Sequence, residues 1–180
     1  MRITLGFKAL ISLAGGLVIT FSQSKSPGQV LHVLAAYAIG HVVLLGIGVL
    51  AKLKREELLA QLPMATFATI IAVIASLGNS NEPPMYDKVH WLIITWGLIS
   101  GAFGIWQVRR VGVDSRAGKD WGISASLVLA LAAGFLMFPN LDIITTEGFF
   151  GAFLVIDGVH LALAATGPRN ESVQSASDAS

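Results

Sequence analysis

Long apolar segments recur six times along this chain, and they constrain its fold more than any other feature. Their approximate ranges are 5–21, 30–50, 63–77, 89–108, 121–138 and 148–165, and polar residues, glycine or proline separate them. An apolar helix of about eighteen residues is roughly 27 Å long, which is close to the thickness of the hydrocarbon core of a bilayer. The pattern therefore predicts an all-α polytopic membrane protein with six transmembrane helices.

Composition agrees with this interpretation and excludes several kinds of site. Of the 180 residues, 54% are hydrophobic and 13% are charged, about half the charge of a typical soluble domain. There is no cysteine, so disulfides, thiolate nucleophiles and cysteine-based metal sites are excluded. The nucleophile-elbow, P-loop, zinc-protease and dinucleotide-binding motifs do not occur in the sequence. We therefore expect no catalytic residue, no metal and no cofactor.

The distribution of basic residues predicts the orientation. With six spans, one side of the membrane receives ten of the twelve Lys and Arg residues, namely Arg2, Lys8, Lys52, Lys54, Arg55, Arg109, Arg110, Arg116, Lys119 and Arg169. The other side receives Lys25 and Lys88, together with acidic residues that include Glu147. The positive-inside rule places both termini in the cytoplasm. We ascribe the basic linkers to this topology, with the bilayer as partner, and expect no binding of nucleic acid.

The six segments also form three repeats of two spans each, at about 3–50, 62–108 and 119–166. Ile39-Gly40-His41, Ile99-Ser100-Gly101 and Ile156-Asp157-Gly158 occupy equivalent places, spaced by 60 and then 57 residues. Because each repeat contains two spans, all three cross in the same sense, which favours a ring of three parallel hairpins over inverted transporter repeats. We expect one membrane domain over 1–168, with the second, fourth and sixth spans around a common axis, and a polar, disordered tail over 169–180.

The third repeat resembles the HdeD-like family of acid-resistance membrane proteins. There an apolar segment with Gly134 ends in Phe138-Pro139-Asn140, and the next segment carries Gly151 and the run Leu154-Val-Ile-Asp-Gly158. The first repeat is similar through Gly15-Gly16 and Ala38-Ile39-Gly40, and the second is the least similar. The resemblance implies six spans in a bacterial inner membrane and a role in tolerating acid or membrane stress, without a defined biochemical activity.

Asp157, near the middle of the sixth segment, is the main candidate for a functional residue. An ionised carboxylate at that depth costs roughly 2.5–3.5 kcal/mol on insertion scales, so it should face other helices. His160 shares its helix face, and His41 is expected at a similar depth. One interpretation is a proton-responsive core of Asp157, His41 and His160. Another is a structural hydrogen bond from Asp157 to Ser100, Ser124, Ser126 or Thr95. Metal binding has compatible ligand types but no further ligand shell.

Small residues predict where helices approach each other closely. Gly97, Ser100, Gly101 and Gly104 form overlapping small-xxx-small pairs in the fourth segment, and Gly151 and Gly158 are seven residues apart in the sixth. We expect them to serve packing within the monomer, and a homodimer interface is the alternative.

Together these features predict a membrane protein of stress-response or structural type that is not an enzyme. An accessory subunit of a larger membrane complex, respiratory or for envelope transport, is an alternative, since the short loops and small size fit it equally well. A small channel or carrier is a third possibility. It would need a continuous polar lining, which only Asp157, His41, His160 and scattered hydroxyls supply.

Overall fold

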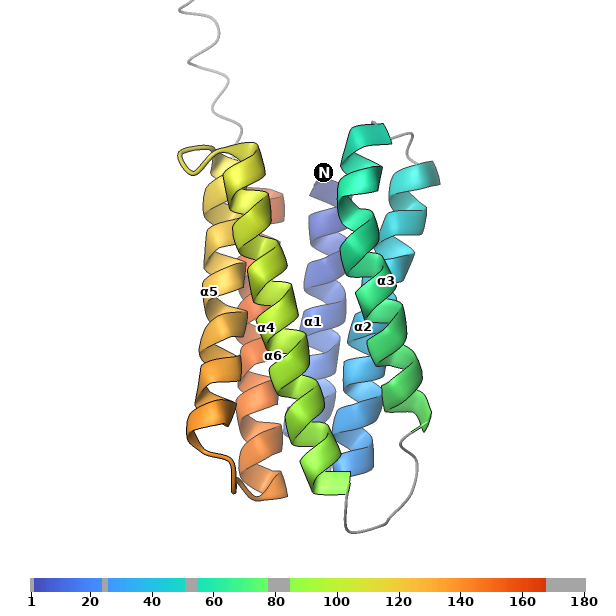
Figure 1. Cartoon of the computed structure of the whole chain (residues 1–180), viewed down its shortest axis with the longest axis vertical. Coiled ribbons are helices and arrows are strands. Elements are labelled where there is room, and N and C mark those ends of the chain that lie inside the picture. Colours follow the sequence, from blue (N-terminus) through green and yellow to red (C-terminus); the bar gives the residue numbers. More distant parts are fainter. Residues whose placement is uncertain (1, 24–25, 51–54, 78–84, 168–180) are drawn as a thin grey trace, which may run out of the picture.

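The computed structural model describes residues 2–23, 26–50, 55–77 and 85–167, and within these ranges the chain forms six α-helices and no strand. The helices are α1 (Arg2–Phe21), α2 (Pro27–Leu50), α3 (Arg55–Leu77), α4 (Met85–Val111), α5 (Arg116–Met137) and α6 (Ile143–Thr166). They stand side by side along the long axis of the molecule, and successive helices run in opposite directions (Figure 1). The predicted all-α class is confirmed, whereas the tail over 169–180 lies outside the described residues.

Five of the described helices are long and apolar enough to cross a membrane: α2, α3, α5, α6 and, over Asp87–Val111, α4. The apolar part of α1, Leu5–Phe21, is shorter. These helices support an integral membrane protein, and a sixth crossing by α1 stays a prediction.

Helix α3 begins earlier than the apolar pattern predicts. The apolar segment at 63–77 would place Pro63 in the first helical turn, but α3 begins at Arg55 and contains Pro63 in its interior. Glu56 and Glu57 lie in the first turn, where negative charge interacts favourably with the helix dipole. The helix therefore continues beyond its apolar part, which the hydrophobic pattern alone does not detect.

The closest helix pairs differ from the hairpins predicted by the repeats. The most extensive contacts join α1 to α6, α4 to α5 and α2 to α3, while the expected pairs α1–α2, α3–α4 and α5–α6 touch less. Helix α2 also contacts α4. The chain thus closes a flattened ring in which its first and last helices are neighbours.

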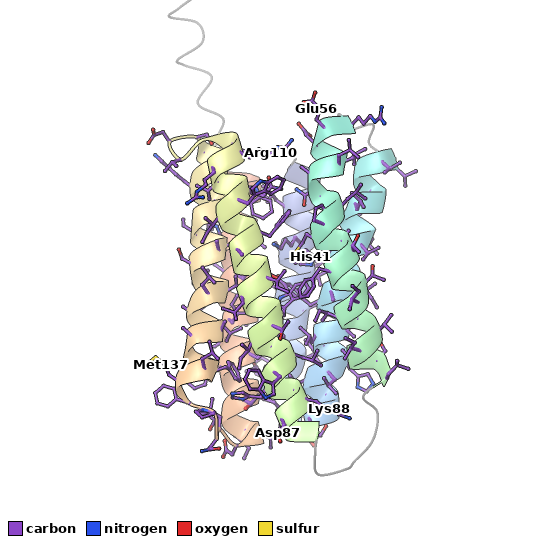
Figure 2. The ribbon with its side chains drawn as sticks, in the orientation of Figure 1. His41, Glu56, Asp87, Lys88, Arg110 and Met137 are labelled. Carbon is purple, nitrogen blue, oxygen red and sulfur yellow. The ribbon has the colours of Figure 1, made fainter. Side chains whose placement is uncertain are left out.

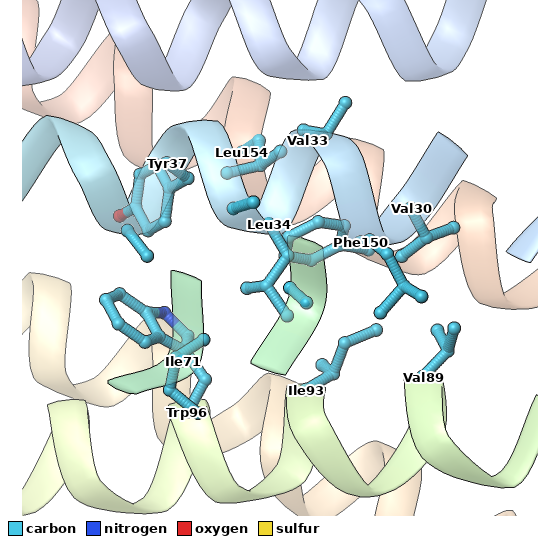
Figure 3. Packing of buried hydrophobic residues seen from close by; sticks show 14 of the residues in the cluster. Val30, Val33, Leu34, Tyr37, Ile71, Val89, Ile93, Trp96, Phe150 and Leu154 are labelled. Atoms are coloured by element: carbon cyan, nitrogen blue, oxygen red, sulfur yellow. The ribbon is translucent and has the colours of Figure 1, made fainter. Parts of the chain in front are cut away.

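Buried apolar side chains form a cluster in one half of the bundle along its long axis. The buried cluster there includes Val30, Leu34, Ile71, Val89, Ile93, Phe150 and Leu154 from four helices (Figure 3). These residues come from the first halves of α2, α4 and α6 and the second half of α3, so they occupy the end of the bundle opposite the start of α1. The polar interior described next lies toward the other end.

Candidate functional site

Asp157 is the centre of a buried polar cluster. Its side chain is 2% exposed. The hydroxyls of Ser12 and Tyr37 donate to Oδ2 at 3.1 Å each, and the hydroxyl of Ser124 donates to Oδ1 at 3.2 Å. These donors come from α1, α2 and α5, while Asp157 belongs to α6. One carboxyl group therefore connects four helices.

Tyr37 continues this cluster into a group of aromatic rings. It packs edge-to-face on His41 and Trp96, with ring centroids 5.1 and 5.6 Å apart, and His41 packs edge-to-face on Trp96 at 5.2 Å. Phe67 of α3 stacks on the indole of Trp96 at 5.8 Å. His41 points into the bundle interior (Figure 2), and its Nδ1 lies 3.1 Å from the carbonyl oxygen of Tyr37. The aromatic rings thus link the carboxyl cluster to α3 and α4.

A small cavity of about 30 Å³ adjoins the carboxyl group and is lined by Asp157, Tyr37, His41, Ser100 and other residues of α1, α4, α5 and α6. The hydroxyl oxygen of Ser100 is buried and has no hydrogen-bond partner among the described residues. A water molecule needs about 10–15 Å³ and at least two polar partners. The space and its lining therefore suit a bridging water between Ser100 and the carboxyl cluster.

A second, larger cavity of about 550 Å³ extends from this cluster to the basic end of the bundle, and we call it the vestibule. All six helices line it, from Glu57, Arg110 and Arg116 at the helix ends to His41 and Ser124 in the interior. His41 and Ser124 also line the small cavity, as do Lys8 and Trp121. Figure 2 shows Glu56 and Arg110 at this end, with His41 deeper. The vestibule therefore leads from the basic end of the bundle to the polar groups near Asp157.

The structure separates the three residues predicted as a proton-responsive core. Asp157 and His41 line the same small cavity, but His160 does not. His160 is half-buried, and its Nε2 lies 3.3 Å from the carbonyl oxygen of Asp120 at the start of α5. His160 therefore joins α6 to α5. Of the four hydroxyls expected to bond Asp157, Ser124 does so, and Ser126 is exposed.

The expectation about the outer rim is wrong, whereas the common axis of the repeats stays a prediction. Glu147 was assigned to a solvated outer rim, but it is fully buried, and its Oε1 accepts a 2.8 Å hydrogen bond from the backbone N–H of Ser26. It joins the beginning of α6 to the turn before α2, a long-range contact that local sequence does not reveal. Ile39 and Ile156 are 48% and 52% exposed, so the two isoleucines of these equivalent positions lie on the outside of the bundle, which does not decide whether the repeats share an axis.

The predicted small residues lie at two close helix contacts. A Cβ atom on Gly97 would lie 2.8 Å from Cβ of Ala132, and one on Gly104 would lie 2.7 Å from Cβ of Ala125. A Cβ on Gly101 would collide with Leu129, so all three glycines of α4 face α5. Ser100 instead lines the small cavity. In the same way Gly151 faces Ile19 and Gly158 faces Leu13, both of α1.

No protein-family model, curated protein or solved structure matches this chain. The resemblance to the HdeD-like family accordingly stays a prediction. Within the ranges that the structure describes, no three His, Asp or Glu side chains are grouped so that they could hold a metal ion. The metal interpretation of Asp157 and the two histidines thus gains no support.

Sequence reasoning missed four residues of this region: Ser12, Tyr37, Lys8 and Gln107. Tyr37 was detectable, because it is four residues before His41 and so shares its helix face. Ser12 and Gln107 carry no comparable signal: the partner of Ser12 lies 145 residues away, and Gln107 is a single polar residue whose burial depends on distant helices. Lys8 was considered only as one of the basic residues that predict the orientation, yet it lines both cavities.

Proposed function

We propose that this chain is a six-span protein of a bacterial inner membrane, of stress-response type, whose Asp157 cluster responds to protons. The observation that carries the proposal is the convergence of three hydroxyls from three helices on one buried carboxyl group beside a cavity. Acidic groups inside transmembrane helices commonly mark proton-linked sites. A role in acid or membrane stress follows from the HdeD-like resemblance.

Protonation of Asp157 would change the number of hydrogen bonds it can accept. An ionised carboxylate only accepts, and here it accepts from Ser12, Tyr37 and Ser124. A protonated carboxyl carries one O–H donor that needs an acceptor, and one of these hydroxyls can supply it by turning. Because Tyr37 packs on His41 and Trp96, such a rearrangement would reach α4. The cluster thus has two hydrogen-bond arrangements that proton concentration can select.

The vestibule would supply protons from the basic end of the bundle, which the positive-inside rule assigns to the cytoplasm. Several titratable or charged groups face this route. At the small cavity these are Lys8 of α1 and Tyr37 and His41 of α2, while α4 and α5 contribute the uncharged Ser100, Trp96 and Ser124 there. The vestibule is lined in addition by charged residues of α3, α4 and α5, namely Glu57, Arg110, Arg116 and Asp120. The remaining candidate, His160, lies one turn from Asp157 and bonds to α5.

Replacing Asp157 with Asn tests the proposal, because the amide keeps the shape and removes the titration. We expect thermal stability and tryptophan fluorescence of the purified parent in lipid nanodiscs to change between pH 5 and pH 8. In Asp157→Asn this change should be largely lost, while Asp157→Leu should also lower the unfolding temperature at every pH. Asp114→Asn, in the exposed turn between α4 and α5, is the matched control and should behave like the parent.

The range from pH 5 to pH 8 lies above the titration of a second carboxylate, Asp142, which also affects folding stability. Asp142 caps α6, and hydrogen bonds from the Thr145 side chain and then its backbone N–H hold the pKa of Asp142 below its usual range. A depressed folded pKa adds stability that is complete above the unfolded value of ~3.9 and is lost as pH falls through the folded value. Asp142 is thus ionised throughout the assay. An unchanged pH profile in Asp157→Asn, or a flat profile in the parent, would contradict the proposal.

The accessory-subunit and carrier functions remain alternatives with their own tests. A stoichiometric foreign protein in the mass of the particle purified under mild conditions would favour a subunit of a larger complex. A carrier would have to open the apolar half of the bundle, where Leu34, Ile93 and Phe150 pack together. The size of the vestibule is the observation that supports a carrier function.

A further inference from the structure

The vestibule has the size and the walls of a small-molecule site. Its volume of about 550 Å³ lies within the roughly 300–1,000 Å³ of ligand pockets. Much of its wall is apolar, including Leu5, Leu44, Leu45, Leu58, Met64 and Leu161. Between its mouth at Arg116 and Ser124, two turns further along α5, the vestibule is roughly 12 Å deep at 1.5 Å per helical residue. A compact ligand with an apolar body fits this space.

One buried donor in this wall is unpaired. Gln107 of α4 is 1% exposed, and its side-chain Nε2 has no hydrogen-bond partner among the described residues. Buried polar groups are almost always paired, so an unpaired amide that lines a cavity indicates an acceptor supplied from the cavity. Gln107 is therefore a candidate ligand-binding donor.

A positive charge lies in the same cavity. Lys8 of α1 is half-buried, and its ammonium group lies 5.7 Å from the centroid of the Trp121 ring. Arg110 and Arg116 line the cavity nearer the helix ends, and Glu57 and Asp120 partly balance them. With three cations and two carboxylates in the lining, the net charge of the wall is +1. Donors and positive charge together favour an acceptor-rich, anionic group.

We infer that the vestibule binds a small organic anion with an apolar body, whose head group is held by Lys8 and Gln107. The leucines and Met64 would contact the apolar body, and the arginines near the mouth would attract the anion. A medium-chain carboxylate has this chemistry, and a single-chain alkyl phosphate shares it. This site is separate from the proposed proton response, since it does not require Asp157 to titrate.

Binding of radiolabelled octanoate to the full chain in lipid nanodiscs tests the inference, with empty nanodiscs to subtract partition into lipid. We expect saturable binding by the protein above the empty discs. Gln107→Leu and Lys8→Gln should each weaken the affinity at least tenfold. Lys88→Gln, at the opposite end of the bundle (Figure 2), is the matched control and should bind as the parent does. Gln107→Leu removes an unpaired donor and breaks no hydrogen bond of that donor, so the unfolding temperature of this variant should not fall.

Competition identifies the head group. Octyl phosphate that displaces octanoate with higher affinity assigns the site to alkyl phosphates, and weaker displacement assigns it to carboxylates. Octylammonium should not displace octanoate. The inference is overturned if binding does not exceed that of empty discs, if octylammonium competes equally, or if Gln107→Leu and Lys8→Gln bind as tightly as the parent. Loss of pH response in Asp157→Asn with octanoate binding intact would separate this site from the proposed function.

Discussion

Tyr37 is the residue that joins the polar and aromatic parts of the interior. Its hydroxyl donates to Asp157, and its ring contacts His41 and Trp96. A buried tyrosine is suited to this position because its ring packs as an apolar group while its hydroxyl still finds a partner. Tyr37 therefore connects Asp157 to Trp96 of α4 through one side chain.

Replacing Tyr37 with Phe should separate the contribution of the hydroxyl hydrogen bond from that of the ring packing. The variant keeps the ring contacts and removes one of the two hydroxyls that donate to Oδ2 of Asp157. A buried hydrogen bond contributes about 0.5–1.5 kcal/mol net, so we expect the free energy of unfolding to fall by about that amount. Ser126→Ala, on the exposed side of α5, should change nothing. Equal unfolding curves for Tyr37→Phe and the parent would show that this bond does not stabilise the cluster.

At the scale of helices, glycine determines which elements pair closely. Gly16 of α1 and Gly151 of α6 let these two helices approach: a Cβ on Gly16 would lie 3.1 Å from the carbonyl oxygen of Gly151. Gly97, Gly101 and Gly104 do the same between α4 and α5. Small residues favour such contacts in membranes, because helices gain from van der Waals packing there more than from the hydrophobic effect.

Alanine substitutions on α4 and α5 test this role of glycine. In Gly97→Ala the new methyl group would lie 2.8 Å from Cβ of Ala132 and 3.0 Å from the carbonyl oxygen of Val128. Overpacking of this kind costs about 1–3 kcal/mol, which we expect as a loss of unfolding free energy in detergent. Gly134→Ala on α5 is the control, because no atom lies within 4 Å of its added methyl group. Equal stability of the two variants would show that the α4–α5 contact tolerates extra volume.

The whole molecule is asymmetric along its long axis. The end that contains the start of α1 carries the described basic residues Arg55, Arg109, Arg110, Arg116 and Lys119 and the mouth of the vestibule. The opposite half is filled by the apolar cluster, and Asp87 and Lys88 lie at its end (Figure 2). The vestibule therefore lies toward the basic end, and the apolar cluster toward the other.

Reporter fusions test the orientation that this asymmetry and the positive-inside rule predict. A reporter after Gly112, between α4 and α5, should be cytoplasmic, and one after Asn140, between α5 and α6, should lie outside. The two sites flank one helix, so they must lie on opposite sides if α5 crosses the membrane. Reporters on the same side would exclude the six-span arrangement, and a reversed result would place the vestibule mouth outside.

The sequence alone determined the helical class and the approximate helix positions. Apolar length and hydrophobicity are local properties, and they located the ends of the described helices to within five residues, except for the beginning of α3. They also identified Asp157, because a single carboxyl group stands out in an apolar segment. The early beginning of α3 was missed, since a helix that continues into polar residues has no apolar signal.

Only the tertiary structure decided which helices became neighbours, and therefore what surrounds Asp157. The repeats favoured contacts within each hairpin, yet glycine contacts bring α6 against α1 and α5 against α4. The contact of α1 with α6 carries Ser12 to Asp157 across a sequence separation of 145 residues, and Tyr37 of α2 and Ser124 of α5 reach the same carboxyl group across separations of 120 and 33 residues. The packing of the helices also buries Glu147 against Ser26 and leaves the vestibule between them. Lateral packing depends on complementary surfaces of distant segments, and no single segment contains that information.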